Sequence, residues 1–220
     1  MGEPEGQRVV LFLLCHREGR RREELLEILW PELSPSLSRN AFYNNVYRAR
    51  KALYKECLIQ EGGTYKINSK GLLRFDLEEF RDLIERAEKL PRMDAERTEL
   101  LGKAVELYQG GFIKEFYSEW AETIRNDAEI QYLRALSQLA GFHLARRNFD
   151  EAAALLEKAL HYDRTDIGAH EELIKLCFLA GNRPEALRRY RLYSDVSLKE
   201  LGAKPPKSLE QLRVEAASRS

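Results

Sequence analysis

Residues 40–67 read NAFYNNVYRARKALYKECLIQEGGTYKI, and two patterns in this stretch decide the predicted fold. In its first half, apolar residues recur at helical spacing, which predicts a helix over residues 36–56. In its second half, two short strand-like runs, residues 58–61 and 64–67, are separated by Gly62-Gly63. Two glycines between such runs favour a tight β-hairpin, because glycine tolerates the left-handed backbone of the turn. We therefore expect a long helix that is followed by a hairpin.

Two shorter helices are expected upstream of this stretch. Residues 9–14 are all apolar and predict a helix that ends before Gly19, where glycine can adopt the left-handed conformation of a helix cap. Residues 22–30 place leucine, isoleucine and tryptophan on one wide face, and Pro31 ends this helix because proline lacks the N–H and clashes with the preceding turn. Three helices followed by a hairpin predict a winged helix-turn-helix domain, which we assign to residues 1–75.

The long helix has an apolar side and a polar side. At 100° per residue, an apolar stripe spans about 60° and is expected to pack inward. This stripe consists of Phe42, Val46, Ala49 and Leu53. The opposite side carries amide, aromatic and basic groups: Asn40, Asn44, Tyr47, Arg48 and Lys51. Asparagine can pair with adenine, arginine with guanine and lysine with phosphate, so this side is predicted to bind the DNA major groove. A merely solvated basic surface is the alternative.

The charge of the chain is unevenly distributed, although 36 basic and 36 acidic side chains make it neutral as a whole. Residues 1–75 hold 13 basic and 9 acidic side chains, a net charge of +4, so residues 76–220 carry −4. Residues 36–55 contain five basic side chains and no acidic one. The first part of the chain is therefore the candidate for contact with a polyanion.

From Phe75 onward the pattern is helical and contains an internal repeat. The expected helices span residues 76–90, 94–108, 119–147, 149–162, 166–180 and 184–201. The segment Asn-Phe-Asp-Glu-Ala at 148–152 recurs 34 residues later as Asn-Arg-Pro-Glu-Ala, a period typical of tetratricopeptide repeats. A degenerate third copy surrounds Ala104, which corresponds to Ala159. We therefore predict a mostly α chain in which residues 76–220 form about three tetratricopeptide-like helical hairpins.

Five segments, taken in their order along the chain, resemble the SARP-type (antibiotic-regulatory) transcriptional activators. These segments are Glu24–Pro31, Tyr47–Leu53, Gly62–Tyr65, Phe75–Leu77 and Glu200–Pro205. In that family a response-regulator-like winged helix is followed by a bacterial transcriptional activator domain. The resemblance implies that the third helix enters the major groove with a reading face of Asn44, Tyr47, Arg48 and Lys51. It also implies that the wing, with Thr64 and Lys66, touches the neighbouring backbone or minor groove.

The chain departs from this family at its beginning. The family's winged helix normally follows an N-terminal β platform, and only about eight residues precede Val9, so we expect the platform to be absent. Either this chain is the C-terminal piece of a larger regulator, or another segment covers the first helix. If the natural chain continues upstream, an exposed apolar patch is expected at Val9, Phe12 and Leu13. An inserted segment carries three aromatic residues, Phe116, Tyr117 and Trp120. These residues are expected to seal the junction between the first two repeats.

The sequence contains no motif for catalysis or for binding a metal or cofactor. The four histidines lack metal-ligand spacing, and Cys15, Cys57 and Cys177 lie far apart. There is no nucleophile elbow and no glycine-rich phosphate loop, so the chain is predicted not to be an enzyme and to hold no cofactor. The run Arg20-Arg21-Arg22 is either a phosphate contact or a solvated cluster beside a turn. Residues 1–6 do not resemble a signal peptide, and no apolar run reaches the ~18 to 20 residues of a membrane span, so a cytoplasmic location without membrane contact is expected.

The predicted function is that of a sequence-specific DNA-binding transcriptional regulator, an activator that reads DNA with its third helix. Its repeat domain is expected to contact RNA polymerase or a regulatory protein, or to receive a signal. The expected DNA is double-stranded with repeated half-sites, occupied by two copies of the protein. The alternative is a protein-interaction scaffold whose winged helix docks protein. Only the regulator should bind duplex DNA in a salt-dependent manner.

Overall fold

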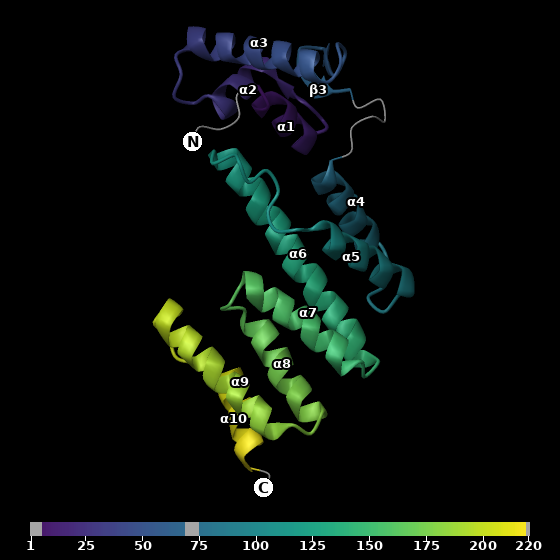
Figure 1. Cartoon of the computed structure of the whole chain (residues 1–220), viewed down its shortest axis with the longest axis vertical. Coiled ribbons are helices and arrows are strands. Elements are labelled where there is room, and N and C mark those ends of the chain that lie inside the picture. Colours follow the sequence, from purple (N-terminus) through teal and green to yellow (C-terminus); the bar gives the residue numbers. More distant parts are fainter. Residues whose placement is uncertain (1–5, 69–74, 219–220) are drawn as a thin grey trace. The chain divides into compact units, whose positions relative to one another are not determined.

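The structure is a computed structural model that describes residues 6–68 and 75–218. Residues 1–5, which make up most of the opening segment considered above, lie outside the described residues. The described part is mostly α-helical and contains three short strands (Figure 1). This confirms the predicted fold class, a winged helix-turn-helix domain followed by an α-helical repeat domain.

The chain divides into two compact units, each assembled from segments that are distant in the sequence. The first unit contains Met1–Leu83 together with Glu106–Gln131. The second unit contains Ile84–Val105 together with Tyr132–Ser220. The domain boundary at residue 75, the absent platform and the number of repeat hairpins stay predictions.

Three helices and a hairpin form the N-terminal part of the first unit. These elements are α1 (Arg8–Cys15), α2 (Arg22–Leu29), α3 (Pro35–Ala52), β2 (Leu58–Glu61) and β3 (Thr64–Ile67). Both strands have the predicted bounds. Pro35 stands in the first turn of α3, where the N–H that proline lacks would have no partner within the helix.

The inward stripe of α3 is buried at three of its four predicted positions. Phe42, Val46 and Ala49 are buried, as the periodicity predicts. The expectation that Leu53 belongs to this stripe is wrong, because α3 ends at Ala52 and Leu53 is 41% exposed. The chain leaves the helix there in order to enter β2, where Leu58 is buried instead.

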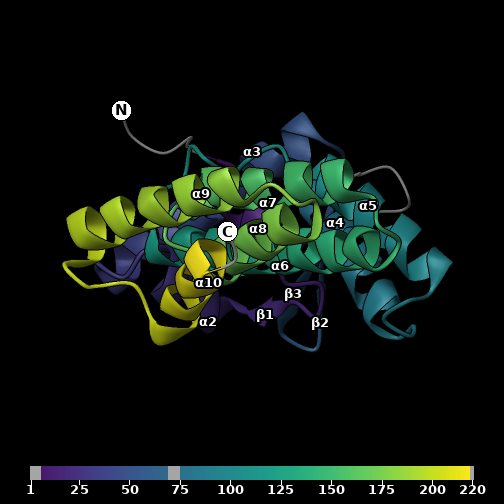
Figure 2. The same ribbon diagram turned by 90° about the horizontal axis from the view of Figure 1, so that it is seen from below.

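A third strand, β1 (Arg20–Arg21), has no counterpart among the predicted elements. It pairs antiparallel with β3, which gives the strand order β1-β3-β2 (Figure 2). Gly19 permits this pairing, because a Cβ at this position would lie 2.4 Å from the carbonyl oxygen of Tyr65. A two-residue strand shows no periodicity and forms because β3 offers it a partner, so local pattern could not reveal it.

The apolar side of α1 is covered by a segment that lies far away in the sequence. Its buried apolar residues are Val9, Val10, Phe12 and Leu13. The expectation of an exposed apolar patch at Val9, Phe12 and Leu13 is therefore wrong for the described structure. The ring of Trp120 meets Phe12 edge-on with 5.5 Å between ring centroids, and Phe116 beside it is fully buried. Tyr117, by contrast, is 70% exposed.

The remaining described elements are helical. They are α4 (Asp76–Glu88), α5 (Ala95–Leu107), α6 (Glu119–Ala145), α7 (Phe149–Tyr162), α8 (Ile167–Leu179), α9 (Arg183–Val196), the π-helix η1 (Ser197–Leu201) and α10 (Lys207–Ser218). The single helix expected over residues 184–201 is thus divided into α9 and η1, and α10 has no predicted counterpart.

The second unit repeats backbone geometry at the 34-residue spacing found in the sequence. The N–H of Asn148 donates to the carbonyl five residues earlier at 2.9 Å, and the N–H of Asn182 makes the same bond at 2.7 Å. The residues before them, Arg147 and Gly181, both have a positive φ, 61° and 75°. The equivalent alanines that follow in α7 and α9 have no exposed surface. The sequence repeat therefore corresponds to a structural repeat.

Helix α10 closes the C-terminal end of the second unit by packing against α8 and α9 (Figure 1). The apolar core at this end consists of Ile174, Cys177, Ala186, Tyr193 and Leu209. Leu209 is the contribution of α10 and is fully buried. At the edge of this core, the hydroxyl of Tyr190 on α9 donates to the carboxylate of Glu210 on α10. This hydrogen bond adds a polar contact between the two helices.

Candidate nucleic-acid interface

Aromatic packing against the wing fixes the rotation of α3 about its axis. Phe42 on α3 meets the ring of Tyr65 on β3 edge-on, with 4.9 Å between ring centroids. Tyr65 is buried and alternates along the strand with Thr64 and Lys66. Because the Phe42 side of α3 faces the sheet, the opposite side faces away from the core.

The outward face of α3 carries the predicted reading residues, and all of them are exposed. These are Asn40, Asn44, Tyr47, Arg48 and Lys51. Tyr47 is 67% exposed. Within residues 6–68 and 75–218, the side chains of Asn40, Asn44 and Lys51 form no hydrogen bond or ion pair. The structure thus places the five residues on one face, and the two amides and the lysine ammonium have no partner among the described residues.

Two further arginines of α3 lie off the outward face and bind backbone carbonyls. The Nε of Arg39 donates to the Pro35 carbonyl at 2.9 Å. The Nη2 of Arg50 donates to the Leu58 carbonyl at 3.0 Å, which ties α3 to β2. Of the basic residues of α3, Arg39 and Arg50 therefore bind the protein's own backbone, whereas Arg48 and Lys51 lie on the outward face.

The stem of Arg48 packs against the chain that precedes α1. Gly6 is buried there and has a φ of +95°, a backbone conformation that favours glycine. A Cβ on Gly6 would lie 2.8 Å from the Arg48 Cδ. The side chain of Arg48 is therefore held by a close backbone approach that a larger residue at position 6 would disturb.

The wing places the two remaining predicted site residues, Thr64 and Lys66, on one side of β3. Both are half-buried, and the Nζ of Lys66 lies 4.0 Å from a carboxylate oxygen of Glu61. Gly62 and Gly63 form the turn with φ values of 57° and 84°, as a type I′ turn requires at both central positions. The sequence alone did not place any residue of β1 beside this wing, yet the register pairs Arg21 with Thr64.

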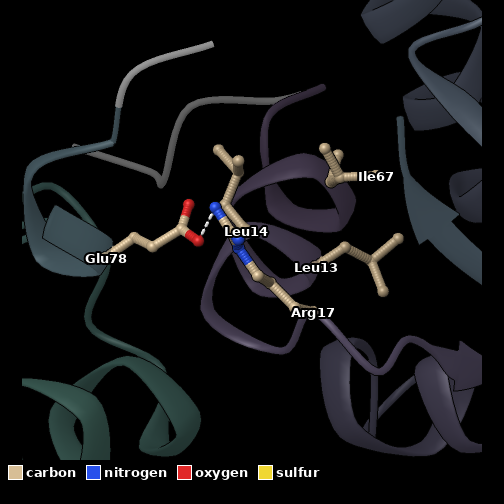
Figure 3. A pocket seen from close by; sticks show the side chains of 5 residues that line it. All are labelled: Leu13, Leu14, Arg17, Ile67 and Glu78. Carbon is tan, nitrogen blue, oxygen red and sulfur yellow. Dashed lines mark ion pairs between the residues drawn. The ribbon is translucent and has the colours of Figure 1, made fainter. Parts of the chain in front are cut away.

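A separate set of contacts joins the end of α1 to α4 within the first unit. Arg17 forms an ion pair with Glu78, and Arg81 donates to the Cys15 carbonyl at 3.2 Å. A cavity of about 150 Å³ lies beside the ion pair and is lined by Leu13, Leu14, Arg17, Ile67 and Glu78 (Figure 3). Burial raises the pKa of the Cys15 thiol to about 12, so the thiol stays protonated and unreactive. These contacts have a structural role.

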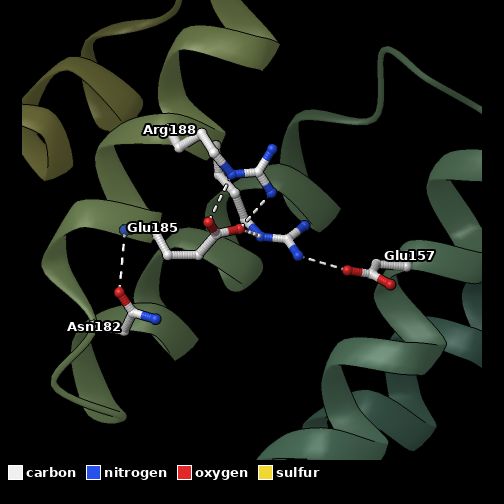
Figure 4. Close-up of polar contacts among 5 residues, drawn as sticks. Glu157, Asn182, Glu185 and Arg188 are labelled. Carbon is white, nitrogen blue, oxygen red and sulfur yellow. Dashed lines mark hydrogen bonds and ion pairs between the residues drawn. The ribbon is translucent and has the colours of Figure 1, made fainter.

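In the second unit, charged side chains are paired with one another. Glu185 of α9 binds Arg188 and Arg189, and Arg189 also binds Glu157 of α7 (Figure 4). We call these four residues the charged cluster. The hydrogen bond from Arg188 lowers the pKa of Glu185. Asn182 caps the same helix, since its side-chain oxygen accepts from the Glu185 N–H at 3.2 Å (Figure 4). The charged cluster thus joins α7 to α9.

The described residues contain no group of three or more histidine, cysteine or acidic side chains that could hold a metal ion. His170 is buried, with its Nε2 at 3.1 Å from the Arg164 carbonyl oxygen and its ring against Tyr193. Burial lowers the pKa of His170, so the ring is neutral near pH 7. Of the helices in the described segments, none combines the length and apolarity needed to cross a membrane.

Residues 75–216 match a family model described as "Bacterial transcriptional activator domain". Over 218 residues, or 96% of the chain, the sequence is 29% identical to "Regulatory protein AfsR" of Streptomyces coelicolor, of whose length it covers 22%. The fold is similar to a solved structure, Mycobacterium tuberculosis EmbR in complex with low affinity phosphopeptide, with a TM-score of 0.72 and 19% identity. That similarity covers 99% of this chain and 60% of the EmbR chain. The chain thus spans about a fifth of the length of AfsR and three-fifths of the EmbR chain.

Proposed function

The chain belongs to the bacterial transcriptional activator domain family, and on this premise we propose that it is a sequence-specific DNA-binding activator of the SARP type. The family is one of transcription regulators and not of enzymes. The observation that carries the DNA-binding part of the proposal is the outward face of α3, which is exposed, free of acidic residues and rich in groups that match base edges.

In this proposal α3 enters the major groove, and its residues make different kinds of contact with DNA. Asn40 and Asn44 pair with the N6/N7 edge of adenine, and Arg48 pairs with O6/N7 of guanine. Lys51 contacts a phosphate, and Tyr47 adds an apolar contact and a hydroxyl. The side-chain amides of Asn40 and Asn44 are available for such pairing because they form no hydrogen bond with any described residue.

The wing contacts the neighbouring backbone or minor groove through Thr64 and Lys66. Lys66 is separated from Glu61 by 4.0 Å, and both side chains are exposed by more than a third. An exposed ion pair of this kind stabilises a protein by less than about 1 kcal/mol. Lys66 can therefore exchange Glu61 for a phosphate at little cost.

Two copies of the protein bind repeated half-sites on one DNA face, with a spacing near ~10 to 11 base pairs or a multiple of it. The repeat domain contacts RNA polymerase or a regulatory protein, in line with its membership of an activator family. A cytoplasmic location follows from this function.

Selection of bound sequences from random duplex DNA, followed by binding to the selected site, tests the proposal. Asn44→Ala and Arg48→Ala should each lose ~1 to 3 kcal/mol on that site and relax the choice of base at one position. Arg39→Ala is the matched control, because Arg39 is on the same helix but off the outward face. It should leave base preference unchanged.

The double variant Asn44→Ala/Arg48→Ala decides between the two functions. If it binds the selected DNA as well as the parent chain does, α3 is not the reading helix. Binding of a protein partner with no salt-dependent binding of duplex DNA would then favour the scaffold function.

A further inference from the structure

Three consecutive arginines connect α1 to α2, and the structure separates their roles. Arg20 is half-buried and donates to the Glu18 carboxylate and, at 2.8 Å, to the Gly19 carbonyl. Arg22 donates to Glu23 at 2.7 Å and to the hydroxyl of Tyr43 at 3.2 Å. Both guanidinium groups are therefore engaged within the protein.

Arg21 differs from its neighbours. It is exposed, and within the described segments its guanidinium forms no hydrogen bond or ion pair. The positive charge of Arg21 contributes to the lowered pKa of Glu23, and that carboxylate is already bound by Arg22. Arg21 thus keeps its donors available.

The register of the sheet places Arg21 next to the predicted wing contacts. Arg21 is directly opposite Thr64, and residues that are directly opposite in an antiparallel pair share one face of the sheet. Side chains alternate along a strand, so Lys66 lies on this same face while Arg20 and Tyr65 lie on the other. We call Arg21, Thr64 and Lys66 the wing strip.

The backbone under the wing strip is held in place by close packing. A Cβ on Gly19 would lie 2.4 Å from the Tyr65 carbonyl oxygen and 2.8 Å from the Thr64 Cγ2, so the position before β1 has no room for a larger residue. The bond from Arg22 to Tyr43 also ties the start of α2 to α3. Tyr43 lies one helical turn before Tyr47, a residue of the outward face.

We propose that the wing strip binds a DNA backbone phosphate and that Arg21 supplies the cation for this contact. The inference rests on the proposed DNA-binding function and extends its interface to β1. A guanidinium presents a planar fork of donors that matches two phosphate oxygens. The guanidinium of Arg21 binds no acceptor among the described residues. Thr64 adds a hydroxyl and Lys66 a second positive charge. Because a phosphate carries no sequence information, Arg21 contributes affinity and not base preference.

Salt dependence of binding tests this assignment in the full chain. Affinity is measured between 50 and 200 mM salt for the selected duplex and for an unrelated duplex of equal length. Arg21→Gln should weaken binding to both duplexes alike and reduce the slope of log affinity against log salt by about one. Arg20→Gln removes the same charge one residue away and is the matched control, with a much smaller change in slope. Arg21→Lys should restore the slope.

Equal slopes for Arg21→Gln and Arg20→Gln would overturn the inference, because the effect would then come from net charge alone. A change in base preference in Arg21→Gln would also overturn it. If Arg21→Gln keeps the slope of the parent chain while Asn44→Ala loses affinity, the proposed function stands and this inference fails. If the parent chain binds neither duplex, the proposed function fails and the inference fails with it.

Discussion

The outward face of α3 and the charged cluster of α7 and α9 are both rich in polar groups, but they differ in where those groups find partners. On α3, Asn44 and Lys51 have no partner within the described residues. In the charged cluster, one carboxylate, Glu185, binds two arginines, and Arg189 binds a second carboxylate on α7. Charge alone therefore does not mark a binding surface. In the proposed function, the α3 face is distinguished by Asn44 and Lys51, whose donors have no partner among the described residues.

The two regions also differ in how the surrounding unit is closed. In the second unit, small residues repeated along the sequence let the helices pack closely, and α10 covers α8 and α9. The first unit closes through Trp120, which belongs to a segment far from α1 in the sequence. The family match begins at residue 75, so α3 lies outside it and the proposed DNA binding rests on the geometry of α3.

The largest effect is expected at Trp120, the residue on which closure of the first unit depends. Trp120 is 8% exposed, and its indole N–H makes no hydrogen bond in the described structure, so it acts by packing. Trp120→Ala should cost about 3 to 5 kcal/mol and accelerate amide hydrogen exchange in α1. Urea unfolding and exchange mass spectrometry measure these changes.

Tyr117→Ala is the matched control, because Tyr117 comes from the same segment and is exposed; it should shift stability by less than about 0.5 kcal/mol. Unchanged exchange in α1 after Trp120→Ala would show that another group covers that helix.

A smaller effect is expected where the repeats of the second unit approach closely. Ala186 has no exposed surface and lies in the core that α10 completes. Ala186→Leu should cost ~1 to 3 kcal/mol through overpacking, without changing DNA affinity. Ala154→Leu, at an exposed position of α7, is the control. A thermal melt in which both variants match the parent chain would contradict the 34-residue register.

Features set by local periodicity could be predicted from the sequence. The hairpin follows from Gly62-Gly63, and the outward face of α3 follows from the spacing of Phe42, Val46 and Ala49. Leu53 fits the same period, but the turn into β2 overrides it. Helix α10 was missed because a short helix with few apolar residues is stabilised mainly by tertiary packing, here through Leu209.

Contacts between distant segments could not be predicted. Nothing local indicates that Trp120 covers Phe12 or that β1 pairs with β3. The same limit applies to the candidate site. Arg20, Arg21 and Arg22 are chemically identical, and only their partners in the fold distinguish Arg21 as the one with unused donors.

Lys51 and Lys175 allow a direct test of whether a lysine without a partner among the described residues and a lysine in an ion pair contribute differently to DNA binding. Lys51→Ala should weaken binding to all duplexes alike and reduce the salt slope by about one, because Lys51 is available to a phosphate. Lys175→Ala removes the same charge from α8, where Lys175 is paired with Glu172 at 2.8 Å, and should leave the slope unchanged. Titration of labelled duplex at several salt concentrations measures both. Equal slopes for the two variants would remove the distinction between the regions.

The smallest effect is expected from His170, which is buried and packs its ring against Tyr193 of the C-terminal core. Burial lowers the pKa of His170 in the folded state, whereas the unfolded chain takes up the proton near the ordinary value of about 6.5. The unfolded state therefore binds more protons below that pH, and stability falls as the pH decreases through 6.5 toward the folded-state pKa. The melting temperature should decrease between pH 7.5 and 5.5, and His170→Gln should flatten this dependence. If the melting temperature depended on pH equally in the parent chain and in His170→Gln, the core would admit the charged ring. The contrast between the packed second unit and the exposed face of α3 would then lose its support.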